Sequence, residues 1–193
     1  MRKILTAVSI LCMILVLASC GSKSETFIDP ISAIDAEETY PSIPASLAVT
    51  YNSVDEIVSD ADIVVKVSVG EQNVELLDGY PQSHTMVEVL KVLKGDVLEG
   101  DVLEVVEEGG QDGEVLGGIP QLSDINDYYL MLTEYNEYYY VCGAFQGRFV
   151  EREGYVFQQA VKDVKLSSDS YSPITSESFE TLITEVVTAD ELS

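Results

Sequence analysis

The chain is poor in the side chains that most enzyme sites need. In 193 residues it has one histidine, His84, and three cysteines. Zinc sites are built from several Cys and His ligands, and nucleophilic catalysis pairs a Ser or Cys with a base. No second histidine, cysteine pair or nucleophile-elbow pattern is present. We therefore expect neither zinc chemistry nor nucleophilic catalysis, and we interpret His84 as an ordinary residue at the rim of a strand.

Cations are also scarce. Ten Lys and Arg stand against 34 Asp and Glu, a formal net charge of −24 at pH 7. Nucleic-acid binding depends on cations that neutralise phosphates, and an acidic surface repels DNA, RNA and anionic lipid headgroups. The composition excludes a nucleic-acid partner and favours basic partners or divalent cations.

The first twenty residues have the layout of a secretory leader. Arg2 and Lys3 precede an apolar run, Ile4–Ala18, which is shorter than the roughly 20 residues needed to cross a bilayer. Leu17-Ala18-Ser19-Cys20 resembles the bacterial lipobox, in which the cysteine receives a diacylglyceryl group and the leader is cut just before it. An ordinary signal peptide with an incidental Cys20, or a buried core helix, are the alternatives.

This resemblance predicts three regions: a signal peptide over residues 1–19, lipidated Cys20 and a flexible tether over 20–50, and a folded domain over 51–193. Without the leader the chain keeps 8 Lys and Arg against 34 acids, a net charge of −26. Two acyl chains on one residue anchor stably. The expected location is the extracellular face of a Gram-positive-like cell membrane, with the membrane as one partner through the diacylglyceryl anchor.

If Cys12 leaves with the leader and Cys20 is lipidated, the folded domain keeps a single cysteine, Cys142. No disulfide within the chain is then possible. Cys142 lies in a β-like run, which indicates a small buried apolar residue rather than a nucleophile.

Patterning in the domain is mainly that of β-strands. Ser53 and Glu56 have the spacing of a helix capping box, and a second amphipathic helix follows Thr175. Between them, six or seven short strands alternate with turn signals, and these are expected at 63–69, 85–93, 102–107, 128–133, 137–142, 145–150 and 155–157. Gly70 is expected to end the first strand, and a β-bulge is expected near Leu90 to Val92. The pattern predicts a small antiparallel β-barrel, with a two-sheet sandwich as the competing geometry.

Five stretches of the domain carry a resemblance to known proteins: Ala61–Val65, Val87–Gly95, Gly100–Asp101 with Val105, Tyr129–Leu132 and Gly143–Phe149. They resemble uncharacterised exported proteins of Gram-positive bacteria, whose domain is similar to the OB-type barrel of the netrin and tissue-inhibitor-of-metalloproteinases superfamily. The resemblance covers about residues 53–157 and implies an OB-like barrel.

The resemblance does not imply that this chain inhibits a metalloprotease. In those inhibitors a free amino-terminal cysteine reaches the target's zinc, whereas Cys20 is expected to be lipidated and separated from the barrel by the tether. The paired cysteines of the inhibitors are absent as well. Fold resemblance alone says little about function.

Four residues are candidates for ligand binding. Six tyrosines crowd residues 128–140, and an exposed tyrosine strip stacks well on sugars or peptides. Because alternate residues face opposite sides of a strand, part of this set is expected in the core, and Tyr129 and Tyr139 are the members proposed for recognition. Gln146 and Arg148 are the polar candidates, with a structural ion pair as the alternative role for Arg148.

Acidic residues gather in or beside a glycine-rich loop between residues 107 and 127. They are Glu107, Glu108, Asp112, Glu114, Asp124 and Asp127. Clustered oxygens suit Ca²⁺, but no EF-hand spacing is present, and a solvated acidic loop is the simpler interpretation.

Together these features predict a membrane-anchored extracellular lipoprotein that is not an enzyme and that binds a protein, peptide or glycan at the cell envelope. No cofactor or metal is expected. A hydrolase of envelope glycan or peptide that uses two carboxylates is one alternative. A Ca²⁺-stabilised structural module is the other.

Overall fold

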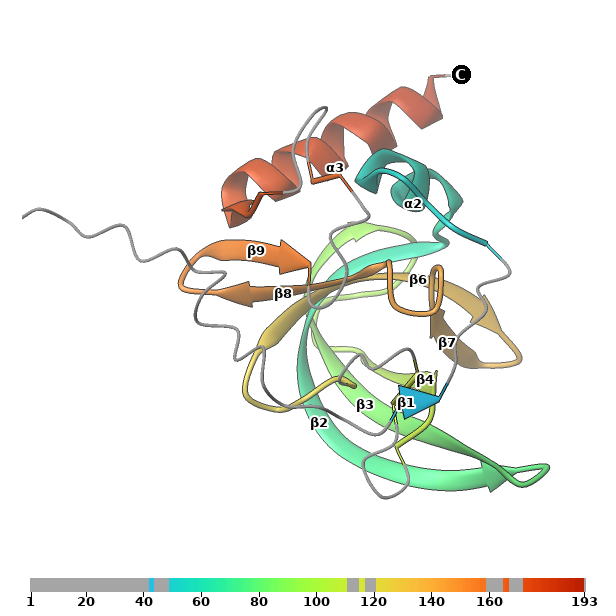
Figure 1. Cartoon of the computed structure of the whole chain (residues 1–193). Helices are drawn as coiled ribbons and strands as arrows, with labels where there is room; N and C mark the ends of the chain where they lie inside the picture. The colour runs from blue at the N-terminus through green and yellow to red at the C-terminus, as the bar shows by residue number, and fades with distance from the viewer. Residues whose placement is uncertain are drawn as a thin grey trace, which may run out of the picture. The chain divides into compact units, whose positions relative to one another are not determined.

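The computed structural model describes residues 42–43, 49–110, 115–116, 121–158, 165–166 and 172–192 (Figure 1). The expected signal peptide, the lipidated Cys20 and nearly all of the expected tether lie outside these residues. Within them the chain is mainly β, with two helices. Neither helix in the described part is long and apolar enough to cross a membrane.

The first helix, α2 (Val54–Asp60), begins where its capping residues predict. The Ser53 side chain is the N-cap and accepts a hydrogen bond from the Glu56 backbone N–H at 3.3 Å. Glu56 in turn accepts from the Asn52 backbone N–H at 2.7 Å, one residue before the position expected for a capping box. The Ser53 hydroxyl thereby satisfies one of the orphan N–H groups at the start of α2, and the Glu56 carboxylate accepts from the N–H just before the helix.

Five strands form a closed ring of hydrogen-bonded neighbours: β2 (Ile63–Leu77), β3 (Tyr80–Lys94), β4 (Val102–Glu108), β6 (Asp127–Tyr135) and β7 (Tyr138–Val141). β2 pairs antiparallel with β3 and β6, and β3 pairs antiparallel with β4. β7 closes the ring because it pairs parallel with β4 and antiparallel with β6.

The remaining strands extend the sheet on one side of β6. β8 (Arg148–Arg152), β9 (Tyr155–Gln158) and β10 (Ile174–Thr175) follow in order, which gives a sheet of eight strands. A separate parallel pair joins β1 (Ser42–Ile43) to β5 (Val115–Leu116). The expected six or seven strands are fewer than the structure has, because strands of two residues leave no period to detect.

The first long strand does not end at Gly70 as predicted. β2 continues through Gly70 to Leu77, and its register with β3 shifts so that Gly70 and Glu71 lie opposite Met86 alone. This is a β-bulge, and glycine suits it because a Cβ at residue 70 would lie 3.1 Å from the Met86 carbonyl oxygen. The bulge expected near Leu90 to Val92 is confirmed, since the register with β2 skips Leu90.

Both helices lie on the same side of the sheet (Figure 1). α3 (Ser176–Glu191) begins at its N-cap Thr175 and packs against α2. The core beneath them joins apolar residues of both helices to one face of the sheet: Val54, Ile57, Tyr129, Met131, Phe149, Phe179 and Ile183. The Phe179 ring lies 5.1 Å from the rings of both Tyr129 and Phe149.

A second set of buried residues occupies the opposite face of the same strands. Its members lie at alternate positions and include Val65, Val67, Val87, Val105 and Leu130. Because side chains of a strand alternate between faces, this set forms a second core on the face of these strands that the helices do not cover. Strands that are buried on both faces need apolar residues at successive positions. The two cores therefore explain why polar and apolar residues alternate only weakly along these strands.

Candidate functional site

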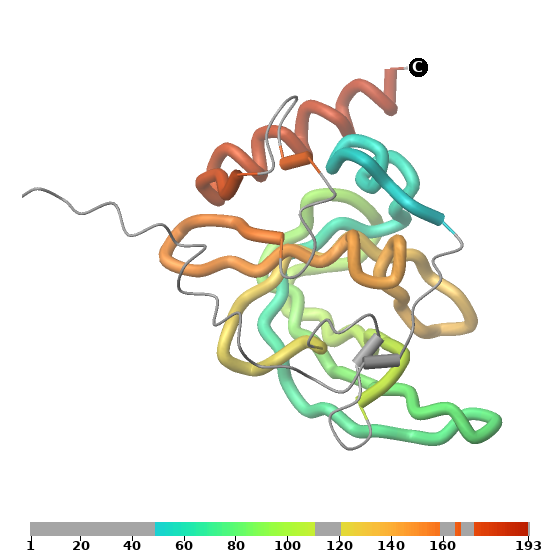
Figure 2. Tube along the Cα trace, in the orientation of Figure 1, coloured from blue at the N-terminus to red at the C-terminus, as the bar shows by residue number. Residues whose placement is uncertain are grey.

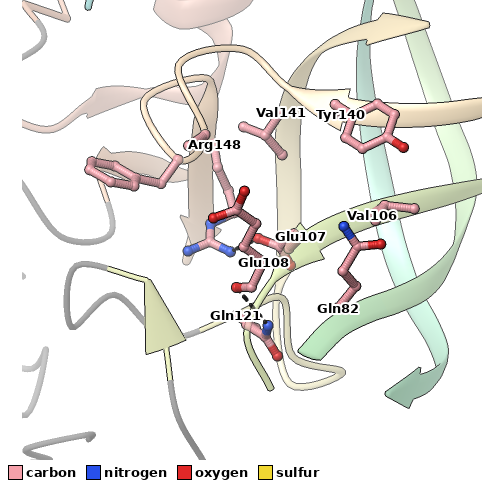
Figure 3. Close-up of a pocket in the computed structure, with 10 residues that line it drawn as sticks. Gln82, Val106, Glu107, Glu108, Gln121, Tyr140, Val141 and Arg148 are labelled. Carbon is pink, nitrogen blue, oxygen red and sulfur yellow. Dashed lines mark hydrogen bonds and ion pairs between the residues drawn. The ribbon is translucent and has the colours of Figure 1, made fainter. Parts of the chain in front are cut away.

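The ring has an opening, which we call the seam, where β4 extends beyond the residues that pair with β7. β7 pairs with β4 only at Val105 and Val106, so Glu107 and Glu108 at the end of β4 have no neighbouring strand on that side among the described residues. A pocket of about 250 Å³ lies here between β4 and the start of β8. Its polar lining, which defines what we call the seam pocket, is Gln82, Glu107, Glu108, Gln121, Tyr140 and Arg148 (Figure 3).

Arg148 is positioned by the tight turn that precedes β8. Gly143 and Ala144 adopt positive φ values of 61° and 62°, and the Gly147 backbone N–H donates to the Cys142 carbonyl at 2.9 Å. Gln146 fixes this turn to the segment before α2, since its side chain accepts from the Tyr51 N–H at 2.9 Å and donates to the Tyr51 carbonyl at 3.0 Å. Arg148 then enters the pocket as the first residue of β8.

A buried ion pair forms one wall of the seam pocket. Arg148 Nη1 donates to Glu107 Oε1, and the two side chains are only 2% and 7% exposed. The other carboxylate oxygen, Glu107 Oε2, accepts from the Leu122 backbone N–H at 3.2 Å. Both oxygens of Glu107 are therefore engaged, and its charge is compensated.

The opposite end of the pocket is held by glutamine contacts. Ser83 Oγ donates to Gln121 Oε1 at 2.6 Å, and Gln121 Nε2 donates to the Glu108 carbonyl at 3.4 Å. Gly110, with φ of 104°, lies so close that a Cβ there would meet Ser83 Oγ at 2.6 Å. Only glycine lets this turn close over the serine and the glutamine.

Three polar groups of the pocket stay available. Within the described part of the chain, the Gln82 amide, the Glu108 carboxylate and the Tyr140 hydroxyl form no side-chain hydrogen bond or ion pair. They come from β3, β4 and β7, and Gln82 lies directly opposite Glu108 in the register of the two strands (Figure 3). Val106 and Phe145 add apolar surface beside them.

Of the four predicted ligand-binding residues, Arg148 alone lines this pocket, and it does so in the ion pair that was its alternative role. Gln146 is 4% exposed and holds Tyr51, as described above. Tyr129 is fully buried in the helix-covered core, and its hydroxyl donates to Glu180 Oε1 at 2.8 Å. Burial and this hydrogen bond raise the pKa of Tyr129. Its ring has no exposed face for a ligand.

Tyr139 lies in a different hollow, with Asp62, Gly95, Asp96 and Glu134. Its pKa is raised by burial and by the charges of Glu134 and Asp101. The neighbouring Tyr140 is the tyrosine that reaches the seam pocket. Sequence reasoning missed Tyr140, Gln82 and Gln121, because the parallel register of β7 on β4 leaves no local signal.

The acidic residues of the expected loop lie in two separate places in the structure. Glu107 and Glu108 belong to the seam pocket, whereas Asp124 and Asp127 lie near Glu151, and Lys66 contacts Glu151 at 2.5 Å and Asp127 at 3.8 Å. Asp112 and Glu114 fall outside the residues whose side chains are described. Among those that are, no group of three or more His, Cys, Asp or Glu is arranged to hold a metal ion.

The contacts of His84 and Cys142 are typical of residues with a structural role. His84 Nδ1 lies 2.8 Å from Glu104 Oε1, and its ring contacts Tyr138 edge-on at 5.6 Å between centroids. Cys142 is a free cysteine, 3% exposed in the core below the helices. Burial, with smaller contributions from Asp60 and Asp62, raises the pKa of the thiol to about 12. A protonated, buried thiol is a poor nucleophile.

No protein-family model matches the chain, and no curated protein matches it significantly.

Proposed function

We propose that this chain is a non-enzymatic binding module, anchored at the extracellular face of the cell membrane through a diacylglyceryl group on Cys20. Its ligand is a protein, peptide or glycan of the envelope, and the seam pocket is the ligand site. The anchor is supported by Arg2 and Lys3, the short apolar run and the Leu17–Cys20 box.

The observation that carries the binding role is the convergence of Gln82, Glu108 and Tyr140, from three strands, on one pocket, where no described residue engages their polar side-chain groups. Hydrogen-bonding groups of this kind fix the orientation of a bound ligand. The volume of about 250 Å³ is below the roughly 300–1,000 Å³ of small-molecule sites. It suits one side chain or one sugar ring of a longer ligand.

The connectivity of the ring supports an OB-like barrel. Counting β2, β3, β4, β6 and β7 as strands one to five, strand one pairs with two and four, and strand three pairs parallel with five. OB barrels are five-stranded and partly open, and they bind ligands on the face of strands two and three. Gln82 and Glu108 belong to the corresponding strands here, β3 and β4. This connectivity also favours the likeness to exported Gram-positive proteins of this barrel type.

The same geometry argues against the two-carboxylate hydrolase. Glycoside hydrolysis uses two carboxyl groups that act as acid and as base or nucleophile. Glu107 is committed to Arg148 and to the Leu122 N–H, which leaves Glu108 as the available carboxylate in the pocket.

The test is retention of envelope components by the purified full-length chain in nonionic detergent. Wild-type protein should retain a component from solubilised envelope, and a Gln82→Ala, Glu108→Gln double variant should retain it at least about tenfold less, because it loses one amide group and one charge. Glu185→Gln on the exposed side of α3 is the control and should retain it fully. Equal retention by both variants contradicts the site, and a cleaved component in the eluate supports the hydrolase instead.

A further inference from the structure

The β2–β3 hairpin extends well past the ring. The last residue of β2 that pairs with β6 is Ser68, yet β2 continues to Leu77 with β3 on one side. Figure 2 shows this hairpin curving away from the helices to a turn at its tip. From Val69 to Leu77, the second edge of β2 has no strand beside it among the described residues. We refer to these nine residues as the open edge.

Apolar side chains are exposed along the open edge and at the tip. Val74 is 43% exposed, Leu76 is 61% and Leu77 is 58%. Tyr80, just after the turn, is 75% exposed. A long edge strand with exposed apolar side chains presents unpaired N–H and C=O groups and is a template for another strand.

The charged side chains in this part of the hairpin are all acidic. Glu71 and Glu75 lie on the open edge and Asp78 lies in the turn, while residues 70–86 contain no Lys or Arg. Two copies of the chain pairing along this edge would bring like charges together, which is unfavourable on adjacent strands. The carboxylates thus oppose self-association and favour a cationic partner.

We propose that the open edge binds an extended, lysine- or arginine-rich peptide segment by β-augmentation. The peptide adds a strand beside β2, so that main-chain hydrogen bonds supply affinity and alternate side chains supply specificity. Glu71 and Glu75 project on one face of β2, whereas Val74 and Leu76 project on the other. The matching sequence alternates cationic and apolar residues.

This inference is independent of the seam pocket, because the open edge lies on β2 and shares no residue with the pocket lining. Loss of binding at one surface therefore leaves the other proposal standing.

The probe is a nine-residue peptide of alternating Val and Lys, titrated into the full-length chain in nonionic detergent. We expect saturable binding, together with slower backbone amide exchange within residues 69–77. A peptide of the same sequence with a methyl group on every backbone nitrogen keeps its charge but has no backbone N–H to donate, and it should bind at least about tenfold more weakly. Absence of binding, or equal binding of the methylated peptide, overturns the proposal.

Charge reversal locates the contact. Glu71→Lys with Glu75→Lys should weaken binding of the Val/Lys peptide by about tenfold or more, because two attractions become repulsions. Glu185→Lys with Glu191→Lys makes the same change in net charge at exposed positions of α3 and should leave the affinity within about twofold. Equal weakening by both pairs overturns the proposal. So does protection of residues 69–77 that rises with protein concentration without peptide, since the occupant is then a second copy.

Discussion

Arg148 and Glu107 form an ion pair between strands that are not neighbours in the sheet. Arg148 begins β8 and Glu107 lies near the end of β4, and the two side chains are 2% and 7% exposed. The pair therefore connects β8 to β4 beyond the two residues of β4 that pair with β7. It also sets the wall of the seam pocket.

Removing one partner of this pair should be costly. Arg148→Ala leaves the Glu107 carboxylate buried without its cation, and we expect a loss of about 3–5 kcal/mol in the free energy of unfolding. Replacing both with apolar residues, Arg148→Met with Glu107→Leu, removes both buried charges and should recover much of that loss. Urea denaturation of the variants measures the difference. A cost below about 1 kcal/mol for Arg148→Ala contradicts the buried pair.

The contact of Glu180 with Tyr129 and Lys91 should make the docking of α3 sensitive to acid. Burial raises the pKa of Glu180, but hydrogen bonds from Lys91 at 2.6 Å and Tyr129 at 2.8 Å outweigh it and lower the pKa below its ordinary value of 4.5. A pKa that is lower in the folded state stabilises the fold above the unfolded pKa, and this stabilisation is lost as the pH falls.

We therefore compare wild type with Glu180→Gln by urea denaturation at several pH values. At pH 7 the variant should be less stable by about 1–2 kcal/mol, because hydrogen bonds to a charged group are lost. The difference should shrink as the pH falls below 4.5. A difference that is constant across this range contradicts the role of the carboxylate.

Two glycines with similar backbone angles should respond differently to alanine. Gly95 and Gly100 have φ values of 99° and 90°, but a Cβ at residue 95 would lie 2.8 Å from the Asp62 carbonyl oxygen, and one at residue 100 meets nothing within 4 Å. Gly100→Ala should cost about 1 kcal/mol from backbone strain. Gly95→Ala adds a clash with the backbone and should cost about 3 kcal/mol. Equal costs in thermal or urea unfolding would show that the close approach at Asp62 is absent.

Cys142 should be protected from thiol reagents by the fold. With its pKa raised to about 12 by burial, the thiolate is present at about one part in ten thousand at pH 8. In a variant with Cys12→Ser and Cys20→Ser, alkylation should be at least about a hundredfold slower in native protein than in urea. Similar rates in both conditions would contradict burial of this side chain.

Local signals in the sequence predict much of the fold. The Ser53 cap, the bulge at Leu90 and the amphipathic helix after Thr175 depend on residues close together in the chain, and the structure has all three. Gly70 is an ambiguous signal, because glycine both ends strands and forms bulges. The continuation of β2 depends on pairing with β3, which a single strand does not encode.

The site was harder to predict because it forms from distant segments. The sequence makes Arg148 a candidate, but its partner Glu107 is 41 residues away, in a segment whose composition indicates an acidic loop. Tyr129 and Tyr140 are separated by eleven positions in one aromatic run, yet the first is covered by α3 and the second faces the pocket. Whether each tyrosine is buried or lines the pocket depends on which element packs over its strand.

The most direct test of the binding role is photo-crosslinking from the wall of the seam pocket in cells that produce the protein. A photoreactive benzoylphenylalanine in place of Tyr140 lies in the pocket, and one in place of Ile125, which is 79% exposed, does not line it. We predict a discrete adduct of the envelope ligand from position 140 that is absent from position 125. No adduct from position 140, or the same products from both positions, would contradict the proposal that this pocket binds the ligand.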